Sequence, residues 1–273
     1  TAWNMSDKIK GTPSIYKEDT IFPKSINFIT SHDGFTLKDL VTFNRKHNFA
    51  NREQNRDGDN HNNSWNHGVE GPTTNSIIRD LRKRQQKNLL LSLLISKGVP
   101  MLLMGDEIGR SQGGNNNSWC QNNMLGWMNW DHDQQDLEML SYLKYLIKIR
   151  KRFIRILNPS FLANQRNIEN IPKYYWHGAN LENPDWSSWS HTIAFSINKE
   201  KTNPLLWVGL NAYSKNIDFS LPKSKGNWLK VLDTSKPEIF EPYLIKDTSI
   251  NIKSRSSVLI ISDEVIGTKN NIS

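Results

Sequence analysis

The chain has 273 residues, and 35 Lys and Arg against 27 Asp and Glu give it a formal net charge of +8. Ten Trp, ten Phe and seven Tyr provide material for a buried core, which excludes global disorder. The longest largely apolar run, 89–95, is far shorter than the roughly 20 residues that a membrane-spanning helix needs. The single cysteine, Cys120, excludes an internal disulfide and a multi-cysteine metal site.

Residues 1 to about 155 predict alternating strands and helices. A β-rich run covers 25–30, and a short helix is expected to begin at Thr36, since Thr36 and Asp39 have the spacing of a capping box. The stretch 44–75 is polar and rich in Asn. In a compact domain, a loop of that length is usually functional or disordered.

The clearest helix is predicted over 75–97, where apolar residues recur at helical spacing and the second half is apolar on all sides. Gly98 follows as a C-cap, and the run 99–104, apolar on both faces, indicates a strand of a parallel sheet that helices cover. A second polar loop, 110–123, separates this strand from a last helix over 133–153.

From about residue 158 the helical periodicity disappears. Short β-like runs separated by Pro, Gly and Asn predict an antiparallel β-sandwich. These runs cover 173–176, 191–197, 205–210, 228–232 and 256–261. The expected fold class is therefore α/β plus all-β, with residues 1–155 as the first domain and 156–273 as the second.

Two strand ends carry candidate functional side chains: His32 and Asp33 follow the first strand, and Asp106 and Glu107 follow the second. In parallel α/β folds, ligands bind at the carboxyl ends of strands. A carboxylate beside an imidazole can accept hydrogen bonds from sugar hydroxyls or stabilise positive charge at a reacting carbon. The alternative is that Asp33 caps the short helix and His32 packs locally. Spacing alone does not make Asp33 and Glu107 the paired carboxylates of a glycosidase.

A series of motifs, in order along nearly the whole chain, resembles the isoamylase-type glycogen and starch debranching enzymes of the α-amylase superfamily. They are SINFITSHDGFTLKDLV at 25–41, KHN at 46–48, SWNHGVEG at 64–71, GVPMLLMGDE at 98–107, GNNN at 114–117, WHG at 176–178, PDW at 184–186 and VLDT at 231–234.

The resemblance implies a (β/α)8 barrel followed by a β-sandwich, with this chain as the last third and the strands at 26–30 and 99–104 as barrel strands seven and eight. His32 and Asp33 match the family's last motif, whose Asp is the third essential carboxylate and holds sugar hydroxyls at the cleaved unit. Asp33 is thereby the catalytic candidate and His32 a substrate-binding one. The family's nucleophile Asp and acid/base Glu follow strands four and five, upstream of Thr1.

The implied activity is retaining cleavage of α-1,6 branch linkages in glycogen or starch, with a branched α-glucan as substrate and no cofactor. Residue 1 is Thr and no signal pattern follows it, so the chain is expected to be a trimmed or processed product or part of a longer polypeptide. Alone, it is expected to be inactive, because the nucleophile and the acid/base are encoded upstream. Because strand edges are left unpaired, the isolated chain is expected to aggregate, to dimerise through the open edge or to need the upstream part of its barrel. The expected location is the cytoplasm, or the plastid stroma in a plant. The alternatives are a non-catalytic glucan-binding or partner subunit and a trehalose-releasing relative.

Both polar loops follow strands at the catalytic end and supply further candidate substrate contacts. Trp65 and Trp119 are expected either to stack on sugar faces or to pack within their loops. Asn116 is expected either to bond sugar hydroxyls or to build turns.

No metal site is expected, because an EF-hand loop starting at Asn55 would need Gly and Glu where Asn60 and Asn66 stand. The basic residues over 79–87 come without a nucleic-acid-binding motif, so neither nucleic acid nor a membrane is an expected partner.

Overall fold

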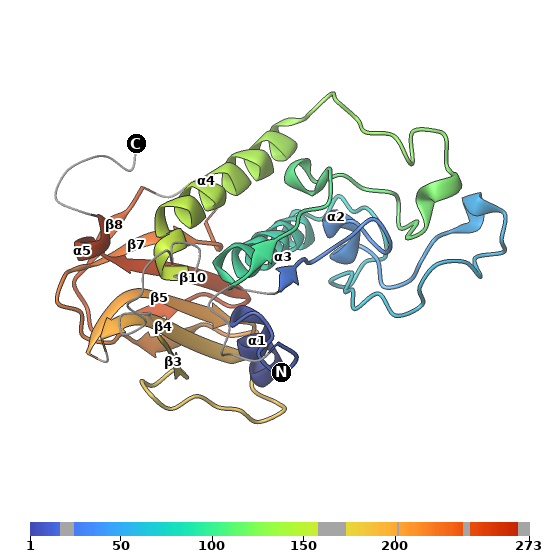
Figure 1. The fold of residues 1–273 in the computed structure, drawn as a ribbon. Coiled ribbons are helices and arrows are strands. Elements are labelled where there is room, and N and C mark those ends of the chain that lie inside the picture. Colours follow the sequence, from blue (N-terminus) through green and yellow to red (C-terminus); the bar gives the residue numbers. More distant parts are fainter. Residues whose placement is uncertain (17–24, 158–172, 201, 237–240, 267–273) are drawn as a thin grey trace. The chain divides into compact units, whose positions relative to one another are not determined.

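The computed structural model describes residues 1–16, 25–157, 173–200, 202–236 and 241–266 (Figure 1). The chain forms two compact units. We call residues 1–25, 95–99 and 148–273 the sheet unit, and residues 26–94 and 100–147 the loop unit.

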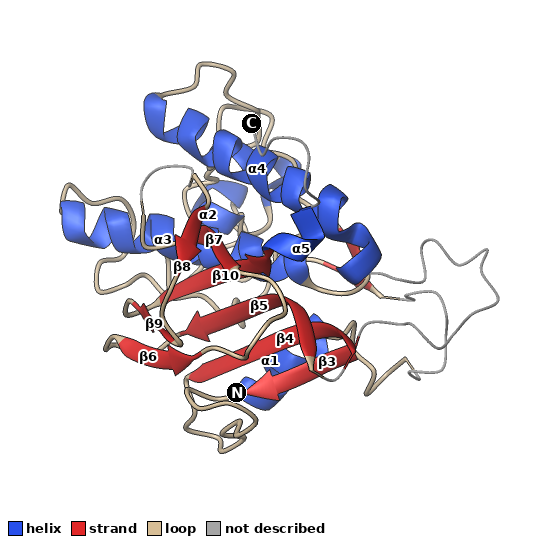
Figure 2. Cartoon of the chain, turned by 90° about the vertical axis from the view of Figure 1, so that its left-hand side faces the viewer, coloured by secondary structure: helices blue, strands red, loops and turns tan. Residues whose placement is uncertain are grey.

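The sheet unit contains a six-stranded antiparallel sheet with the strand order β3-β4-β5-β10-β7-β8 and a two-stranded sheet of β6 and β9 (Figure 2). The helix α1 (Ala2–Ile9) precedes the strands, and α5 (Asp263–Ile266) follows them. The strands are β3 (Lys173–His177), β4 (Thr192–Glu200), β5 (Asn203–Asn211), β6 (Ile217–Ser220), β7 (Trp228–Asp233), β8 (Tyr243–Ile245), β9 (Ser249–Ile252) and β10 (Ser256–Ser262). The predicted antiparallel β-rich region is thereby confirmed.

The two sheets enclose an apolar core. Trp207 of β5 meets Phe219 of β6 edge to face, with the ring centroids 6.0 Å apart, and both side chains are fully buried. A side chain at Gly209 would lie 2.4 Å from Ile252 of β9, so this glycine lets the two layers approach closely. The register of β10 shifts against β7 between Leu259 and Ile260, which is the irregularity of a β-bulge.

Early in the chain, β1 (Ile26–Asn27) pairs with β2 (Val99–Pro100). The amide of Val99 donates to the carbonyl of Ser25 at 2.9 Å, and that of Met101 donates to Asn27 at 2.8 Å. Because both partners advance together along the chain, the pairing is parallel. Both strands are shorter than expected, because within the described residues each has one neighbour and the ladder stops after these bonds.

Three helices of the chain begin where the capping residues predict. In α2 (Leu37–Leu40), the Thr36 hydroxyl accepts from the Asp39 amide at 3.2 Å. In α3 (Ser76–Ile95), the Asn75 side chain accepts from two amides of the first turn, and Gly98, with a φ of 117°, follows the C-terminus. In α4 (Gln134–Leu157), Asp133 forms a reciprocal capping box with Asp136.

Three short 3-10 helices complete the loop unit. They are η1 (Phe49–Asn51), η2 (Asp106–Ile108) and η3 (Ser118–Cys120). No helix among the described residues is long and apolar enough to cross a membrane.

Candidate functional site

His32 and Asp33 stand on the turn that follows β1, and both side chains are open to solvent, at 87% and 80% exposure. The His32 Nε2 lies 3.4 Å from the Asp33 Oδ2. The cap of α2 is Thr36, so the interpretation of Asp33 as the helix cap is wrong. The backbone amide of Gly34, at a φ of 95°, donates to the Asn116 carbonyl at 3.1 Å and fixes the turn to the second polar loop.

The buried carboxylate of Asp106 holds the segment that carries this turn. Asp106 is 2% exposed; one of its oxygens accepts from the Leu37 amide at 2.9 Å, and the other accepts from the Thr30 hydroxyl. Burial raises the pKa of Asp106 to about 6, although these hydrogen bonds oppose the shift. Asp106 thereby ties together the two ends of the segment that carries His32 and Asp33, which is a positioning role.

A second buried carboxylate shapes the loop after β2. The sequence predicted that Asp39 completes a capping box, but most donors to its carboxylate come from the second polar loop rather than from the helix start. It accepts from the Ser111 hydroxyl and from the amides of Gln112 and Gly114, at 2.7 and 3.3 Å. Burial outweighs these bonds and raises the pKa of Asp39. The two carboxylate oxygens of Asp39 are occupied by three donors of this loop. The capping box is therefore half formed: the Asp39 amide donates to the Thr36 hydroxyl, but the Asp39 carboxylate does not accept from the Thr36 amide.

The two polar loops are joined by asparagine side chains. Asn116 is 2% exposed; its Oδ1 accepts from Asn48 at 2.8 Å, and its Nδ2 donates to the Asn62 side chain at 2.6 Å and to the Asp59 carbonyl at 2.8 Å. Both the oxygen and the nitrogen of the Asn116 side chain are therefore hydrogen-bonded to other residues of the chain. These contacts favour the turn-building alternative, and a direct sugar contact by Asn116 stays a prediction.

Asp57 lies inside the same network. Its Oδ2 accepts from Asn51 at 2.7 Å and from Asn117 at 3.0 Å. Burial opposes ionisation of this carboxyl, but the amide donors outweigh that effect and lower its pKa. Among the described residues, no group of three or more His, Cys, Asp or Glu could hold a metal ion.

The loop 44–75 is anchored by two charged residues to which the sequence assigned no role. The buried Lys46 ammonium donates to three consecutive backbone carbonyls, those of Arg56, Asp57 and Gly58, at 2.7–3.2 Å. Glu70 accepts from the amides of Asn44 and Arg45, from Asn66 and from His47, at 2.8–3.1 Å. Burial opposes ionisation of Glu70, but these bonds outweigh it and lower its pKa to about 2.

Arg82 of α3 stabilises the C-terminal part of the same loop. Its buried guanidinium donates to the backbone carbonyls of Thr42, Asn66, Val69 and Gly71. Burial lowers the pKa of Arg82, and the charge of Glu70 opposes that shift. The loop 44–75 has little regular secondary structure, and it is held in place by Lys46, Glu70 and Arg82. The sequence could not predict this role, because these side chains bind backbone groups at irregular distances along the chain.

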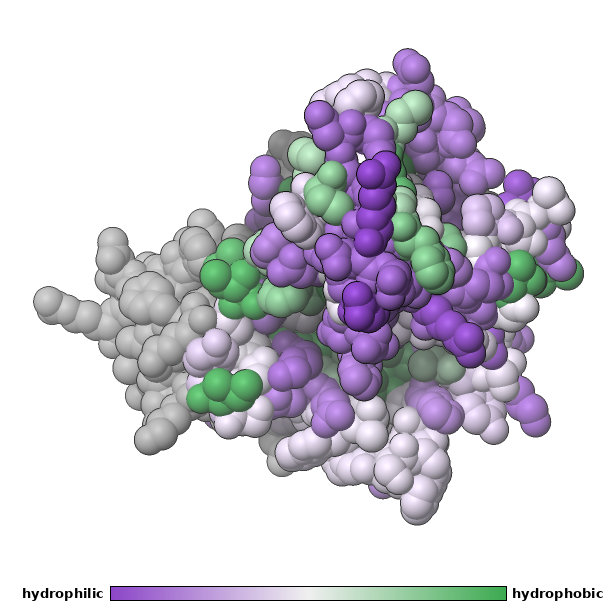
Figure 3. Space-filling view, turned by 90° about the vertical axis from the view of Figure 1, so that its right-hand side faces the viewer, coloured by the Kyte–Doolittle hydropathy of each residue, from purple (hydrophilic) through white to green (hydrophobic). Residues whose placement is uncertain are grey.

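The two candidate tryptophans are exposed in different settings. Trp65 is 48% exposed and its ring lies 4.3 Å from that of His67. Trp119, in η3, is 84% exposed. Figure 3 shows a largely hydrophilic face of the molecule with separate apolar patches. Both rings are therefore accessible to a ligand.

Comparison with known proteins connects this fold to one class. A family model described as "Isoamylase 1-3, C-terminal" matches residues 175–264. Isoamylase 1, chloroplastic, of Oryza sativa subsp. japonica is 38% identical over 242 residues, which are 88% of this chain and 29% of the relative. The GlgX homolog of Mycobacterium tuberculosis is 34% identical over 257 residues, 87% of this chain and 36% of the relative. The chain spans about a third of the length of these curated relatives.

Solved structures show the same class of fold. The pullulanase from Bacillus acidopullulyticus superposes with a TM-score of 0.62 at 17% identity, over 96% of this chain and 26% of that one. The catalytic module of the pneumococcal protein SpuA gives a TM-score of 0.61 at 14% identity, over 95% of this chain and 39% of that one. The fold is thus one that pullulanases share. Within that class, the sequence corresponds to the C-terminal portion of the isoamylase-type debranching enzymes.

Proposed function

We propose that this chain is the C-terminal part of a glycoside hydrolase that cleaves α-1,6 branch linkages of glycogen or starch with retention of configuration. The observation that carries the proposal is the exposed His32–Asp33 pair at a strand end, held by the buried Asp106, in a sequence similar to debranching enzymes. The proposed substrate is a branched α-glucan. The proposed location is the cytoplasm or the plastid stroma.

In this proposal β1 and β2 are the seventh and eighth strands of a (β/α)8 barrel, and the domain boundary lies near residue 155. Their parallel hydrogen bonds and the helices that follow each strand support the assignment. Parallel barrels place their active sites at the carboxyl ends of the strands, which is where His32 and Asp33 stand.

Asp33 is assigned to accept hydrogen bonds from sugar hydroxyls at the cleaved unit. Such bonds strengthen as the ring flattens toward an oxocarbenium-like transition state, so they raise the rate more than they raise substrate affinity. His32 is assigned to the same sugar, and Trp65 and Trp119 to stacking on further units. The nucleophile and the acid/base are assigned to an upstream segment of the barrel, so the 273-residue chain alone is expected to be inactive.

The test is Asp33→Asn in a polypeptide that joins this sequence to the upstream barrel segment. We expect kcat on a branched glucan to fall by about a thousandfold or more, with a much smaller change in KM. Asp59→Asn, at another exposed carboxylate of the loop unit, is the control and should retain activity close to the parent. Near-parental turnover by the Asp33→Asn enzyme would show that the assigned role is wrong.

A further inference from the structure

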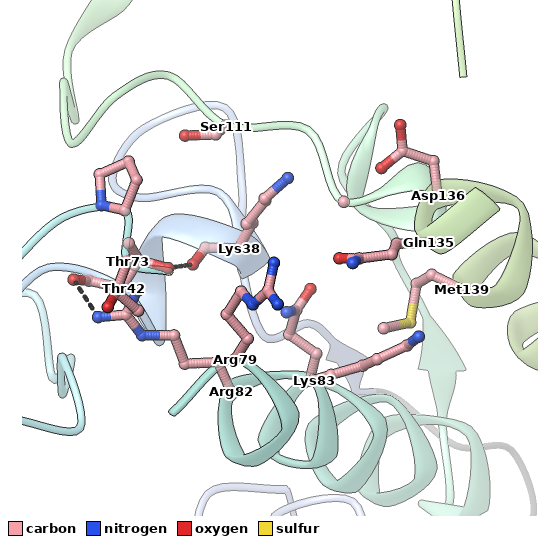
Figure 4. Close-up of a pocket in the computed structure, with 13 residues that line it drawn as sticks. Lys38, Thr42, Thr73, Arg79, Arg82, Lys83, Ser111, Gln135, Asp136 and Met139 are labelled. Carbon is pink, nitrogen blue, oxygen red and sulfur yellow. Dashed lines mark hydrogen bonds between the residues drawn. The ribbon is translucent and has the colours of Figure 1, made fainter. Parts of the chain in front are cut away.

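The loop unit contains a cavity of about 240 Å³ (Figure 4). Neither His32 nor Asp33 lines it. It is lined by residues of α2, the first half of α3, the start of α4 and two loop segments. Its size is below the roughly 300–1,000 Å³ of pockets that hold drug-sized ligands, so it suits one small group. The side chains that the inference uses are Lys38, Arg79, Lys83, Gln135 and Asp136.

Positive charge converges on this cavity from two elements. Figure 4 shows the ammonium of Lys38, from α2, and the guanidinium of Arg79, from α3, directed into the same space. Neither head group has an ion-pair or side-chain hydrogen-bond partner within the described part of the chain. Lys83 lies one helical turn after Arg79 and is paired with Glu138.

One carboxylate, that of Asp136, also lines the cavity, and within the described residues it forms no ion pair with Lys38 or Arg79. Asp136 is engaged in the capping box of α4, where one of its oxygens accepts from the Asp133 amide at 3.3 Å. The Gln135 side chain also points into the cavity and adds an uncharged donor (Figure 4). The cavity therefore presents two cations without ion-pair partners, an amide and one carboxylate around a space that fits a small anion.

We propose that this cavity binds a phosphate monoester, with Lys38 and Arg79 as its charged ligands. Like charges that face one another are unfavourable unless an anion lies between them. A dianion satisfies both, and the planar guanidinium of Arg79 can bond two phosphate oxygens side by side. An uncharged glucan carries no negative charge with which Lys38 or Arg79 could form an ion pair. The phosphate belongs either to a free hexose phosphate or to an ester on a glucan, and the site does not depend on the proposed hydrolase activity.

The experiment is isothermal titration calorimetry of the 273-residue chain with glucose 6-phosphate and, separately, with inorganic phosphate. We expect saturable binding that weakens about tenfold or more in Lys38→Ala and in Arg79→Ala, because each removes a charge-assisted contact. Lys144→Ala/Lys151→Ala removes two exposed cations of α4 and should bind like the parent. Lys38 and Arg79 are exposed, so both variants are expected to fold like the parent, and circular dichroism of each variant checks this.

No binding by the parent chain would overturn the proposal. Equal loss in the α4 double variant would also overturn it, because the effect would then follow net charge rather than this cavity. A phosphate-bearing maltodextrin and its dephosphorylated counterpart identify the source of the anion. Tighter binding of the phosphorylated form supports a glucan ester, whereas binding of glucose 6-phosphate alone supports a free hexose phosphate.

Discussion

Asp106 bonds both ends of the segment that carries His32 and Asp33, so Asp106→Asn tests what the buried carboxylate costs the folded state. The substitution keeps the shape of the side chain and an oxygen that can accept from the Leu37 amide. Its Nδ2 can donate to the Thr30 hydroxyl, which reverses the direction of that hydrogen bond. What the variant loses is the buried ionisable group.

The size of the effect follows from the pKa. Burial raises the pKa of Asp106 from 3.8 to about 6, and at 1.36 kcal/mol per pKa unit this corresponds to about 3 kcal/mol. Because the folded state holds the proton more tightly, the stability from this group is fully present below pH 3.8 and is lost as the pH rises through about 6. Relative to the parent, Asp106→Asn is therefore expected to gain up to about 3 kcal/mol between pH 4 and pH 8.

Urea denaturation followed by tryptophan fluorescence at a series of pH values measures this difference directly. The free energy of unfolding of the variant minus that of the parent should rise between about pH 4 and pH 6 and level off above pH 6. Asp80→Asn, at an exposed carboxylate of α3, controls for loss of a surface charge. If the profiles of the parent and Asp106→Asn run parallel from pH 4 to pH 8, the carboxylate is not buried as described.

Two further substitutions test the loop anchors. Glu70→Gln should be less stable than the parent at pH 7; because the folded pKa is lowered to about 2, the difference should shrink as the pH falls from 4.5 toward 2, and a pH-independent difference in thermal melts would contradict this. Arg82→Ala should lose about 2–4 kcal/mol in urea denaturation and expose the loop 44–75 to proteolysis, since it leaves buried carbonyls without their donor. Arg79→Ala, one turn earlier on α3 and exposed, is the matched control. A similar loss of unfolding free energy in both variants would show that Arg82 does not anchor the loop.

The helices α2, α3 and α4 were predictable because their signals are local, whereas α1 and α5 were not expected. Asn75 and Gly98 flank α3, and Asp133 opens α4, at positions that the sequence reveals. The long strands β5 and β10 were predictable because they are almost continuously apolar. The short strands β6, β8 and β9 were not expected, since three or four residues carry too weak an alternation to stand out.

The candidate site was predictable only in part. Motif resemblance identified His32 and Asp33, and their positions after β1 follow from the order of the elements. The supports of the site join residues far apart in sequence: Asp106 and Thr30 are 76 positions apart, and Asn48 and Asn116 are 68 apart. No spacing within one loop can reveal such partners, so the positioning role of Asp106 emerged only from the structure.

The most direct test of the central claim is a crystal structure of the polypeptide that carries both this sequence and the upstream barrel segment, with a branched maltooligosaccharide bound. The proposal predicts sugar hydroxyls within hydrogen-bonding distance of the Asp33 carboxylate and His32 at the branch point, with Asp106 still bonded to Thr30 and Leu37. A glucan bound elsewhere, with His32 and Asp33 facing solvent, would contradict it.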